Sequence, residues 1–266
     1  NVANALIEDS GAQGDPTQLT DDPNVLLSIT TLHEYLTMRN WTSLNAQYPI
    51  YLAYCPLLMM MDSKFVAYTG TPKTSSAVVI AGIGQATLSN NLWLDGFQTA
   101  LTVSFSSLAL KNSTFRRNKG EVHGALLLDD LQNVEINDCI FECNRGSTGG
   151  AITTNSPVKI VNSTFAWNSA TQGGAIFTTS SSLEIVGSTF LHNHANQGAG
   201  ICVVSPRAAI QKNWDDRNLV RVRDCNFTLN RAHSEAGAIW TSASVSLLAR
   251  GTLFDSNSAH NRGGAL

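Results

Sequence analysis

Charge is scarce in this chain. Asp, Glu, Lys and Arg make up 14% of the 266 residues, and the formal net charge is only -3. About a quarter of residues are charged in an ordinary soluble domain. A net charge so close to zero predicts no basic stripe, which argues against nucleic acid or an anionic membrane surface as a partner.

Long apolar runs are also missing. The longest compact one is "PLLMMM" at 56–61, far short of the roughly 20 residues that span a bilayer, so no transmembrane segment is expected in this fragment. The sequence starts at Asn1 with neither an initiator Met nor a signal region. We therefore expect a processed chain or a segment of a longer protein.

What the chain has is a repeat. A Phe is followed by an Asn three residues later in six places, and a small-residue corner such as "GGAI" follows each pair, ending in an aliphatic residue. The spacings between the Phe residues are 26, 24, 25, 37 and 27. The six pairs are Phe115/Asn118, Phe141/Asn144, Phe165/Asn168, Phe190/Asn193, Phe227/Asn230 and Phe254/Asn257.

The repeat continues upstream of each Phe with a period of two. Aliphatic residues stand seven and, in five of the six units, five positions before it, and four of the six positions between them are charged, namely Glu135, Lys159, Glu184 and Arg221. This alternation predicts a strand with one buried face. Asn, Asp or Gly, which tolerate positive φ, stand three residues before each Phe and mark a corner there.

These units predict an all-β fold, a right-handed parallel β-helix with coils of about 25 residues. Equal positions of successive coils should stack about 4.8 Å apart. The stack should hold a Phe ladder inside and an Asn ladder along one corner, where the amides bond to one another and to turn backbone.

The chain is divided at residue 75. Residues 1–75 are interpreted as a leader and cap, with a short capping helix at 28–40 on the spacing of Leu32, Tyr35 and Leu36. Residues 76–266 are predicted to form the β-helix, regular from about 105 and, we expect, truncated in an unfinished coil at Leu266. The spacing of 37 marks a surface insertion at 205–218.

The FxxN and GGA[ILV] motifs resemble those of the chlamydial polymorphic outer membrane proteins, over roughly 105–266. The same repeat occurs in surface proteins of protists and algae. The resemblance implies an autotransporter-like cell-surface β-helix that acts as an adhesin or scaffold, with no catalytic residues to transfer. Ala236 and His123 depart from the pattern at the first Gly of the corner.

Candidates for chemistry are weak. The acidic pairs Asp129-Asp130 and Asp215-Asp216 lie in different loops, and His233 and His260 share a position in neighbouring coils without a third ligand. Cys139 and Cys225 share a column three coils apart, roughly 14 Å, too far for a disulfide. Cys55, Cys143 and Cys202 complete no framework. We therefore expect no enzyme, no cofactor and no metal.

Four sequons are present, at Asn40, Asn112, Asn162 and Asn226. Asn112 and Asn162 occupy a corner position and Asn226 should point outward, so these three should be exposed. The alternative is that "NST" is simply the turn sequence of this repeat.

The residue after each corner aliphatic predicts where a partner binds. If the aliphatic points inward, the next residue points outward, which gives the column Leu127, Thr153, Phe177, Cys202 and Trp240. Exposed apolar surface usually marks a contact site, so Leu127, Phe177 and Trp240 are the candidate partner-binding residues.

The function expected from these observations is a non-enzymatic cell-surface or extracellular scaffold or adhesion segment of a larger protein. Its partners would be other protein chains, through self-assembly or a surface partner, with glycans as a further candidate. The alternatives are a carbohydrate-binding module and a carbohydrate-active, pectin lyase-like β-helix. The alternative interpretation of the apolar column is that the leader or the 205–218 loop folds back over this face.

Overall fold

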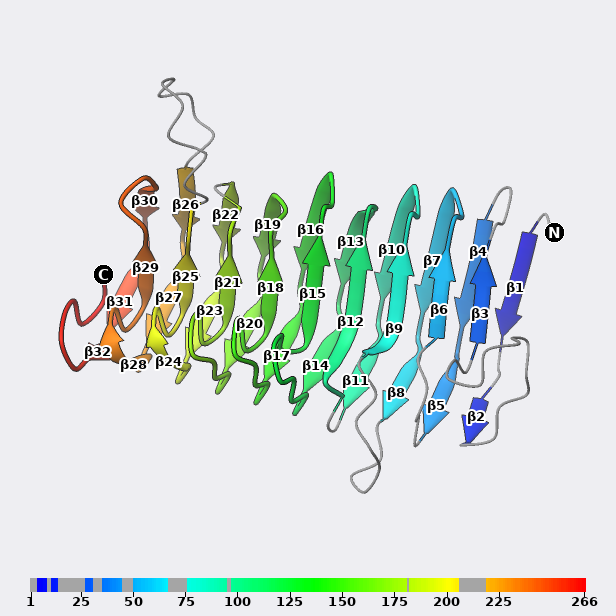
Figure 1. Ribbon diagram of the computed structural model, residues 1–266, viewed down its shortest axis with the longest axis horizontal. Coiled ribbons are helices and arrows are strands. Elements are labelled where there is room, and N and C mark those ends of the chain that lie inside the picture. The colour runs from blue at the N-terminus through cyan, green and yellow to red at the C-terminus, as the bar shows by residue number, and fades with distance from the viewer. Residues whose placement is uncertain are drawn as a thin grey trace.

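The computed structural model describes residues 4–8, 11–13, 27–30, 35–44, 50–66, 76–94, 97–180, 182–205 and 219–266. Throughout this part of the chain the regular elements are β-strands. They stack side by side along one long axis, with the N-terminus and the C-terminus at opposite ends (Figure 1). All strand pairs are parallel, and successive turns of the chain supply neighbouring strands of each sheet. The predicted parallel β-helix is therefore confirmed.

Sheet A holds the first strand of each coil and has ten strands. They are β1 (Asn4–Glu8), β4 (Tyr35–Arg39), β7 (Leu57–Met61), β10 (Gln85–Ser89), β13 (Ser107–Lys111), β16 (Asn133–Asn137), β19 (Val158–Val161), β22 (Leu183–Val186), β26 (Leu219–Arg223) and β30 (Ser246–Arg250).

Sheet B carries the Phe ladder and also has ten strands. They are β2 (Gly11–Gln13), β5 (Thr42–Leu44), β8 (Lys64–Val66), β11 (Leu92–Leu94), β14 (Thr114–Arg116), β17 (Ile140–Glu142), β20 (Thr164–Ala166), β23 (Thr189–Leu191), β27 (Asn226–Thr228) and β31 (Leu253–Asp255).

Sheet C follows the Gly corner and has nine strands, and a short sheet D of three strands lies in the turn between sheets B and C. Sheet C consists of β3 (Leu27–Thr30), β6 (Ile50–Ala53), β9 (Ser76–Ala81), β12 (Thr99–Ser104), β15 (Leu126–Asp129), β18 (Ile152–Thr154), β21 (Ile176–Thr178), β25 (Ile201–Val203) and β29 (Ile239–Thr241); sheet D consists of β24 (His194–Gln197), β28 (Arg231–Glu235) and β32 (Ser258–Ala259).

The expected capping helix at 28–40 is wrong. The described part of this segment forms strands β3 and β4, and Leu36, Thr37 and Met38 are all buried in β4. Pairing of β4 with β1 and β7 on its two sides outweighs the helical spacing of the sequence. Strands β1 to β8, which precede residue 76, lie in the same three sheets as the later strands.

The corner between sheets A and B has the conformation that its residues suggested. Asn112, Asp138 and Asn162 have φ of 43°, 55° and 49°, and Gly187 follows at 60°. Asn and Asp are among the few non-glycine residues that accept this left-handed region readily. The column also extends further upstream than the repeat motif shows, through Asn40, Asp62 and Asn90.

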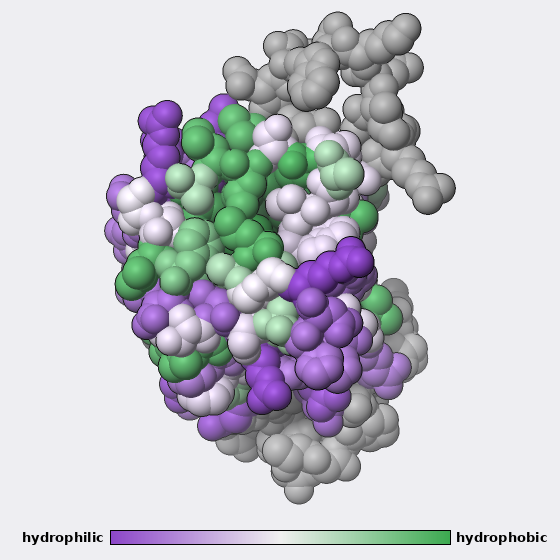
Figure 2. Space-filling view, turned by 90° about the vertical axis from the view of Figure 1, so that its left-hand side faces the viewer, coloured by the Kyte–Doolittle hydropathy of each residue, from purple (hydrophilic) through white to green (hydrophobic). Residues whose placement is uncertain are grey.

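The core is a set of ladders. Phe115, Phe141, Phe165, Phe190 and Phe227 are fully buried, and neighbouring rings stack nearly parallel with centroids 4.4–5.0 Å apart. Trp93 and Phe65 continue the stack toward the N-terminus. A view along the axis shows a hydrophobic area bordered by hydrophilic side chains at the C-terminal end (Figure 2).

The Asn ladder is buried from Asn118 to Asn230, and Asn257 is half-buried. Its amides bond from coil to coil, and the exception is Oδ1 of Asn118, which has no hydrogen-bond partner among the described residues. Asn168 illustrates it: its Oδ1 accepts from the backbone N–H and Nδ2 of Asn144, at 3.0 and 3.1 Å. Its own Nδ2 donates to the carbonyl of Phe141 at 2.9 Å and to Oδ1 of Asn193 at 3.1 Å. The side chain therefore ties three coils together, as the sequence predicted.

The second Gly of the corner is required by close approach between coils. A Cβ on Gly174 would lie 2.3 Å from the carbonyl oxygen of Ala199, well inside van der Waals contact. The first Gly of the corner is favoured by its backbone conformation, since Gly149, Gly173 and Gly198 all have positive φ. Ala236 takes the same conformation, with φ of 53°. The replacement of Gly by Ala at this position therefore leaves the backbone of the coil unchanged.

Candidate interaction face

A column of side chains follows the outer face of sheet C. The strand registers place Leu127 opposite Thr153, Thr153 opposite Phe177, Phe177 opposite Cys202 and Cys202 opposite Trp240. The column continues toward the N-terminus, and we call the whole of it the sheet C ridge: Tyr51, Val79, Thr102, Leu127, Thr153, Phe177, Cys202 and Trp240.

Burial varies along the sheet C ridge. Leu127, Phe177 and Trp240 are half-buried, whereas Thr153 and Cys202 are buried. Thr153 donates from Oγ1 to the carbonyl of Thr148, in the turn before its strand, at 2.7 Å. Desolvation raises the pKa of the Cys202 thiol to about 12, so this group is neutral and unreactive at physiological pH. From Leu127 to Trp240, the accessible part of the ridge is therefore its large apolar side chains.

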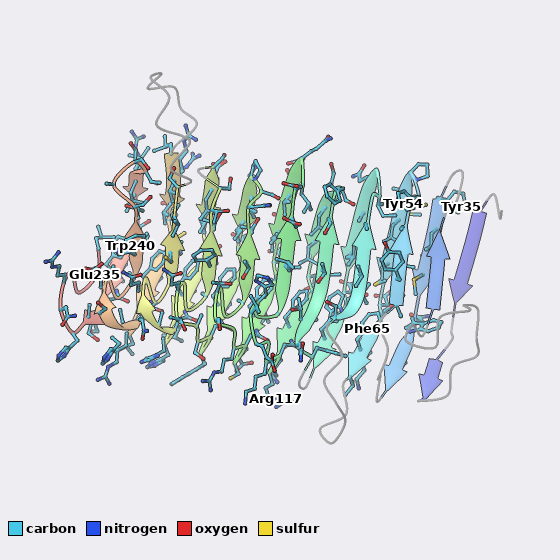
Figure 3. All side chains as sticks on the ribbon, viewed as in Figure 1. Tyr35, Tyr54, Phe65, Arg117, Glu235 and Trp240 are labelled. Carbon is cyan, nitrogen blue, oxygen red and sulfur yellow. The ribbon has the colours of Figure 1, made fainter. Side chains whose placement is uncertain are left out.

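A polar ladder lies beside the ridge and fixes its last aromatic ring. Nε1 of Trp240 donates to Oε2 of Glu235 at 3.0 Å, and the two side chains are neighbours at the C-terminal end of the stack (Figure 3). The same carboxylate oxygen accepts from Nε2 of Gln197 at 3.3 Å, and Gln197 in turn accepts from Gln172 at 3.2 Å. These bonds hold the indole in one orientation.

Comparison with known sequences agrees with this geometry. The sequence model of the right handed beta helix region matches residues 13–165, which is more than half of the chain. The chain belongs to the right-handed β-helix family. The matched range begins at residue 13, covers the first two FxxN units and ends at Phe165 of the third, so this β-helix extends upstream of residue 76.

One curated relative is the metabotropic glutamate receptor-like protein R of Dictyostelium discoideum, to which this β-helix is 38% identical over 78 residues. The alignment covers 29% of this chain and 5% of the relative. The chain therefore spans a small fraction of that protein. No solved structure matches this β-helix significantly.

The structure describes one of the two acidic pairs and the histidine pair. Asp129 and Asp130 share one partner, since Nδ2 of Asn155 donates to both, at 2.6 and 3.4 Å. Asp215 and Asp216 lie outside the described residues. His233 and His260 stack with ring centroids 6.0 Å apart. Among the described residues no group of three or more His, Cys, Asp or Glu side chains could hold a metal ion.

The cysteines lie where the repeat predicts. Cys139 and Cys225 occupy equivalent positions at the start of sheet B and are buried, and all five cysteines are free thiols. Burial raises the pKa of Cys139 to about 12. Cys143 is exposed at the turn that follows sheet B. No described helix is long and apolar enough to cross a membrane.

The sequons fall on two kinds of position. Asn40, Asn112 and Asn162 share the exposed corner between sheets A and B, with φ between 43° and 52°. Asn226 is half-buried on the outer face of β27, where its Oδ1 accepts from the hydroxyl of Thr228 at 2.7 Å.

This difference predicts unequal modification. If the protein is produced in a eukaryotic secretory pathway, we expect glycans at Asn112 and Asn162 and lower occupancy at Asn226, because an exposed corner is more accessible than a strand face. Glycopeptide mass spectrometry of the native protein would measure the occupancy of each site. Higher occupancy at Asn226 than at the corner sites would contradict the prediction.

Sequence reasoning missed apolar groups in the N-terminal coils. Leu57, Met59 and Met61 are half-buried on the outer face of sheet A, and Tyr54 and Phe105 are exposed at the corner after sheet C. Extending the period of two upstream from the regular coils would have found the residues of β7. The turn residues carry no comparable signal.

Proposed function

We propose that this β-helix is a non-enzymatic scaffold or adhesion segment of a cell-surface or extracellular protein, and that it binds a neighbouring protein chain through the sheet C ridge. The observation that carries the proposal is the row of half-buried apolar side chains, among them Leu127, Phe177 and Trp240, held in register on one face.

The chemistry of the ridge suits protein contact. Large aromatic side chains are the commonest anchors of protein interfaces, because they bury much apolar area at little cost in conformational entropy. The bond from Trp240 to Glu235 orients its ring before a partner arrives, and such preorganisation reduces the entropy lost on binding. The ridge also has one side chain per coil, because the strands of sheet C pair in register.

The proposed cell-surface or extracellular location is supported by two similarities to other proteins. The FxxN and GGA[ILV] units resemble those of surface-exposed β-helices, and the Dictyostelium relative is a receptor-like protein by name. Both favour a cell-surface or extracellular setting. The aligned part is 5% of that relative, so its activity as a whole is not transferred to this chain.

The partner tested first is a second copy of this chain. We expect the double variant Phe177→Lys/Trp240→Lys to abolish concentration-dependent association in sedimentation velocity, because two charges would have to be desolvated in the interface. The thermal transition should stay nearly unchanged.

The matched control is Met59→Lys/Leu248→Lys, which adds the same charges at half-buried positions on the outer face of sheet A. It should associate like the unmodified protein. If the ridge variant instead loses much of its stability while association persists, the ridge belongs to the interior of the protein and the proposal is wrong.

A further inference from the structure

A second surface follows the Asn ladder. Five of the six ladder Asn residues are buried, and Asn257 is half-buried. The residues immediately before and after each of them face outward on the turn that follows sheet B. We call these two columns the corner edge. The column before the ladder is Arg117, Cys143, Trp167, His192, Leu229 and Ser256, and the column after it is Lys119, Arg145, Ser169, His194, Arg231 and Ser258.

The corner edge is rigidly placed by backbone bonds between coils. Parallel bridges join Lys119 to Arg145, Arg145 to Ser169 and Ser169 to His194, and strand pairing continues to Arg231 and Ser258. The N–H groups of Arg145 and Arg231 donate to the carbonyls of the Asn residues one coil earlier, at 2.8 and 2.9 Å. The side chains of this column therefore repeat at the coil spacing of about 4.8 Å.

The column before the ladder carries bulky side chains such as Trp167 on a backbone with positive φ. All six of its residues have φ between 53° and 58°, a left-handed region that is unfavourable for residues other than Gly, Asn or Asp. Trp167 is nevertheless 55% exposed, and its ring stacks on His192 with centroids 4.0 Å apart. The corner edge thus carries a broad, solvent-facing aromatic surface.

The charge on the corner edge has one sign. Its twelve positions hold four Arg or Lys residues and two His residues, and no Asp or Glu. Lys119, Arg145 and Arg231 are exposed. Among the acids nearby, Glu142 forms an ion pair with Arg116, while Glu121 and Asp255 lie just outside the two columns. Figure 3 shows Arg117 projecting from this edge of the stack.

The single thiol of the edge adds no negative charge. Partial burial and the carboxylate of Glu142 raise the pKa of Cys143, against the opposing effect of the Arg116 and Arg117 guanidinium groups. The thiol is therefore neutral near physiological pH. The net charge of the whole chain did not reveal this basic edge, because acidic residues elsewhere in the sequence offset the cations that lie along this one corner.

We propose that the corner edge binds a linear acidic polysaccharide, carboxylated or sulfated, laid along the axis of the stack. Lys119, Arg145 and Arg231 would pair with its anionic groups, since charge-assisted hydrogen bonds to carboxylate and sulfate oxygens are strong. From Lys119 to Arg231 is four coil steps, about 19 Å. One coil step is close to the length of one pyranose residue in an extended chain.

Trp167 would contact the sugar rings of the polysaccharide. The apolar face of a pyranose ring packs well on a flat exposed aromatic ring, and Trp167 lies between Arg145 and His194 in the coil order. Single-stranded nucleic acid, in contrast, is held by successive aromatic platforms for successive bases. The corner edge offers one indole, backed by one imidazole, and this favours a saccharide over a nucleic acid.

This inference is independent of the protein-binding role proposed for the sheet C ridge, because it concerns a different face of each coil. Its test uses the triple variant Lys119→Ala/Arg145→Ala/Arg231→Ala, whose side chains are exposed and whose backbone bonds stay in place. The matched control is Lys111→Ala/Lys159→Ala/Arg250→Ala, which removes three exposed cations from the outer face of sheet A. Both variants change the net charge equally.

Binding would be measured by fluorescence anisotropy at several salt concentrations, with labelled heparin oligosaccharide, oligogalacturonate, neutral dextran and oligodeoxythymidylate as probes. We expect the edge variant to weaken binding of the acidic saccharides at least tenfold and to flatten the salt dependence. The control should bind like the unmodified protein. Trp167→Ala should weaken binding several-fold with an unchanged salt dependence. The preferred acidic saccharide distinguishes sulfate from carboxylate recognition.

Three results would overturn the inference. These are equal losses in the edge and control variants, dextran binding as tight as that of the acidic saccharides, and oligodeoxythymidylate binding at least as tight as theirs. Circular dichroism of each variant would show that the stack is folded, so a loss of binding is assigned to the removed side chains.

Discussion

Replacing Phe165 with alanine is expected to lower the free energy of unfolding by about 3–5 kcal/mol. The ring is fully buried and lies between those of Phe141 and Phe190, at centroid distances of 5.0 and 4.7 Å. Neighbouring coils are held at the spacing of their backbone hydrogen bonds, so they cannot close over the space left by the ring. A cavity would remain, and both adjacent rings would lose stacking area.

Urea denaturation followed by circular dichroism would measure this loss. Lys159→Ala, on the exposed column of sheet A, is the control and should change the free energy of unfolding by less than about 0.5 kcal/mol. Similar losses in the two variants would show that the inward and outward columns are misassigned.

Asn168→Ala is expected to lower the free energy of unfolding by about 3 kcal/mol or more. The substitution leaves the N–H of Asn144 without its acceptor and the carbonyl of Phe141 without its side-chain donor. It also removes the two amide bonds to Asn144 and Asn193. Each buried polar group left unsatisfied costs about 1–3 kcal/mol, and the interior of a stack gives water little access to replace the lost partners.

The control for this substitution is Asn137→Ala, at a half-buried position on the outer face of sheet A, which should cost far less. Amide hydrogen exchange would locate the effect, because the N–H of Asn144 should exchange much faster in Asn168→Ala while distant coils keep their protection. Unchanged protection at Asn144 would mean that the amide ladder is not what holds this corner.

The parts of the fold that were predictable are those where one residue type suits one environment. Asn112, Asp138 and Asn162 indicated a corner because few residues tolerate positive φ, and the alternation around Glu135 and Lys159 separated core from surface. Repetition made these weak local signals reliable, since each column is sampled once per coil.

The conformation of the turn after the Phe strand could not be predicted from the sequence in the same way. Arg117, Trp167 and Leu229 have positive φ although none of them favours it. Their conformation is imposed by the buried Asn that follows and by the bonds between coils, which are tertiary interactions. The failed helix at 28–40 has the same origin, because pairing with neighbouring strands decided its structure.

The candidate site was predicted in part. The period of two placed Phe177 and Trp240 on one face, and the strand registers show that they share a column. The bond that orients Trp240 depends on Glu235, which the turn brings back beside the strand, and no periodicity encodes that turn. The corner edge was missed for a similar reason, since Arg117, Lys119 and Arg145 stand in turns and Arg231 begins the short strand β28, outside the strands that show the period of two.

Because the coils stack in register, the side chains of one surface column recur only at fixed intervals along the axis of this molecule. Two side chains in one column can only be separated by a whole number of coil steps of about 4.8 Å, because the strand registers allow no intermediate offset. A long ligand therefore engages many groups at once only if its own repeat is commensurate with that step. Such a molecule selects its ligands by their period as well as by their charge and shape.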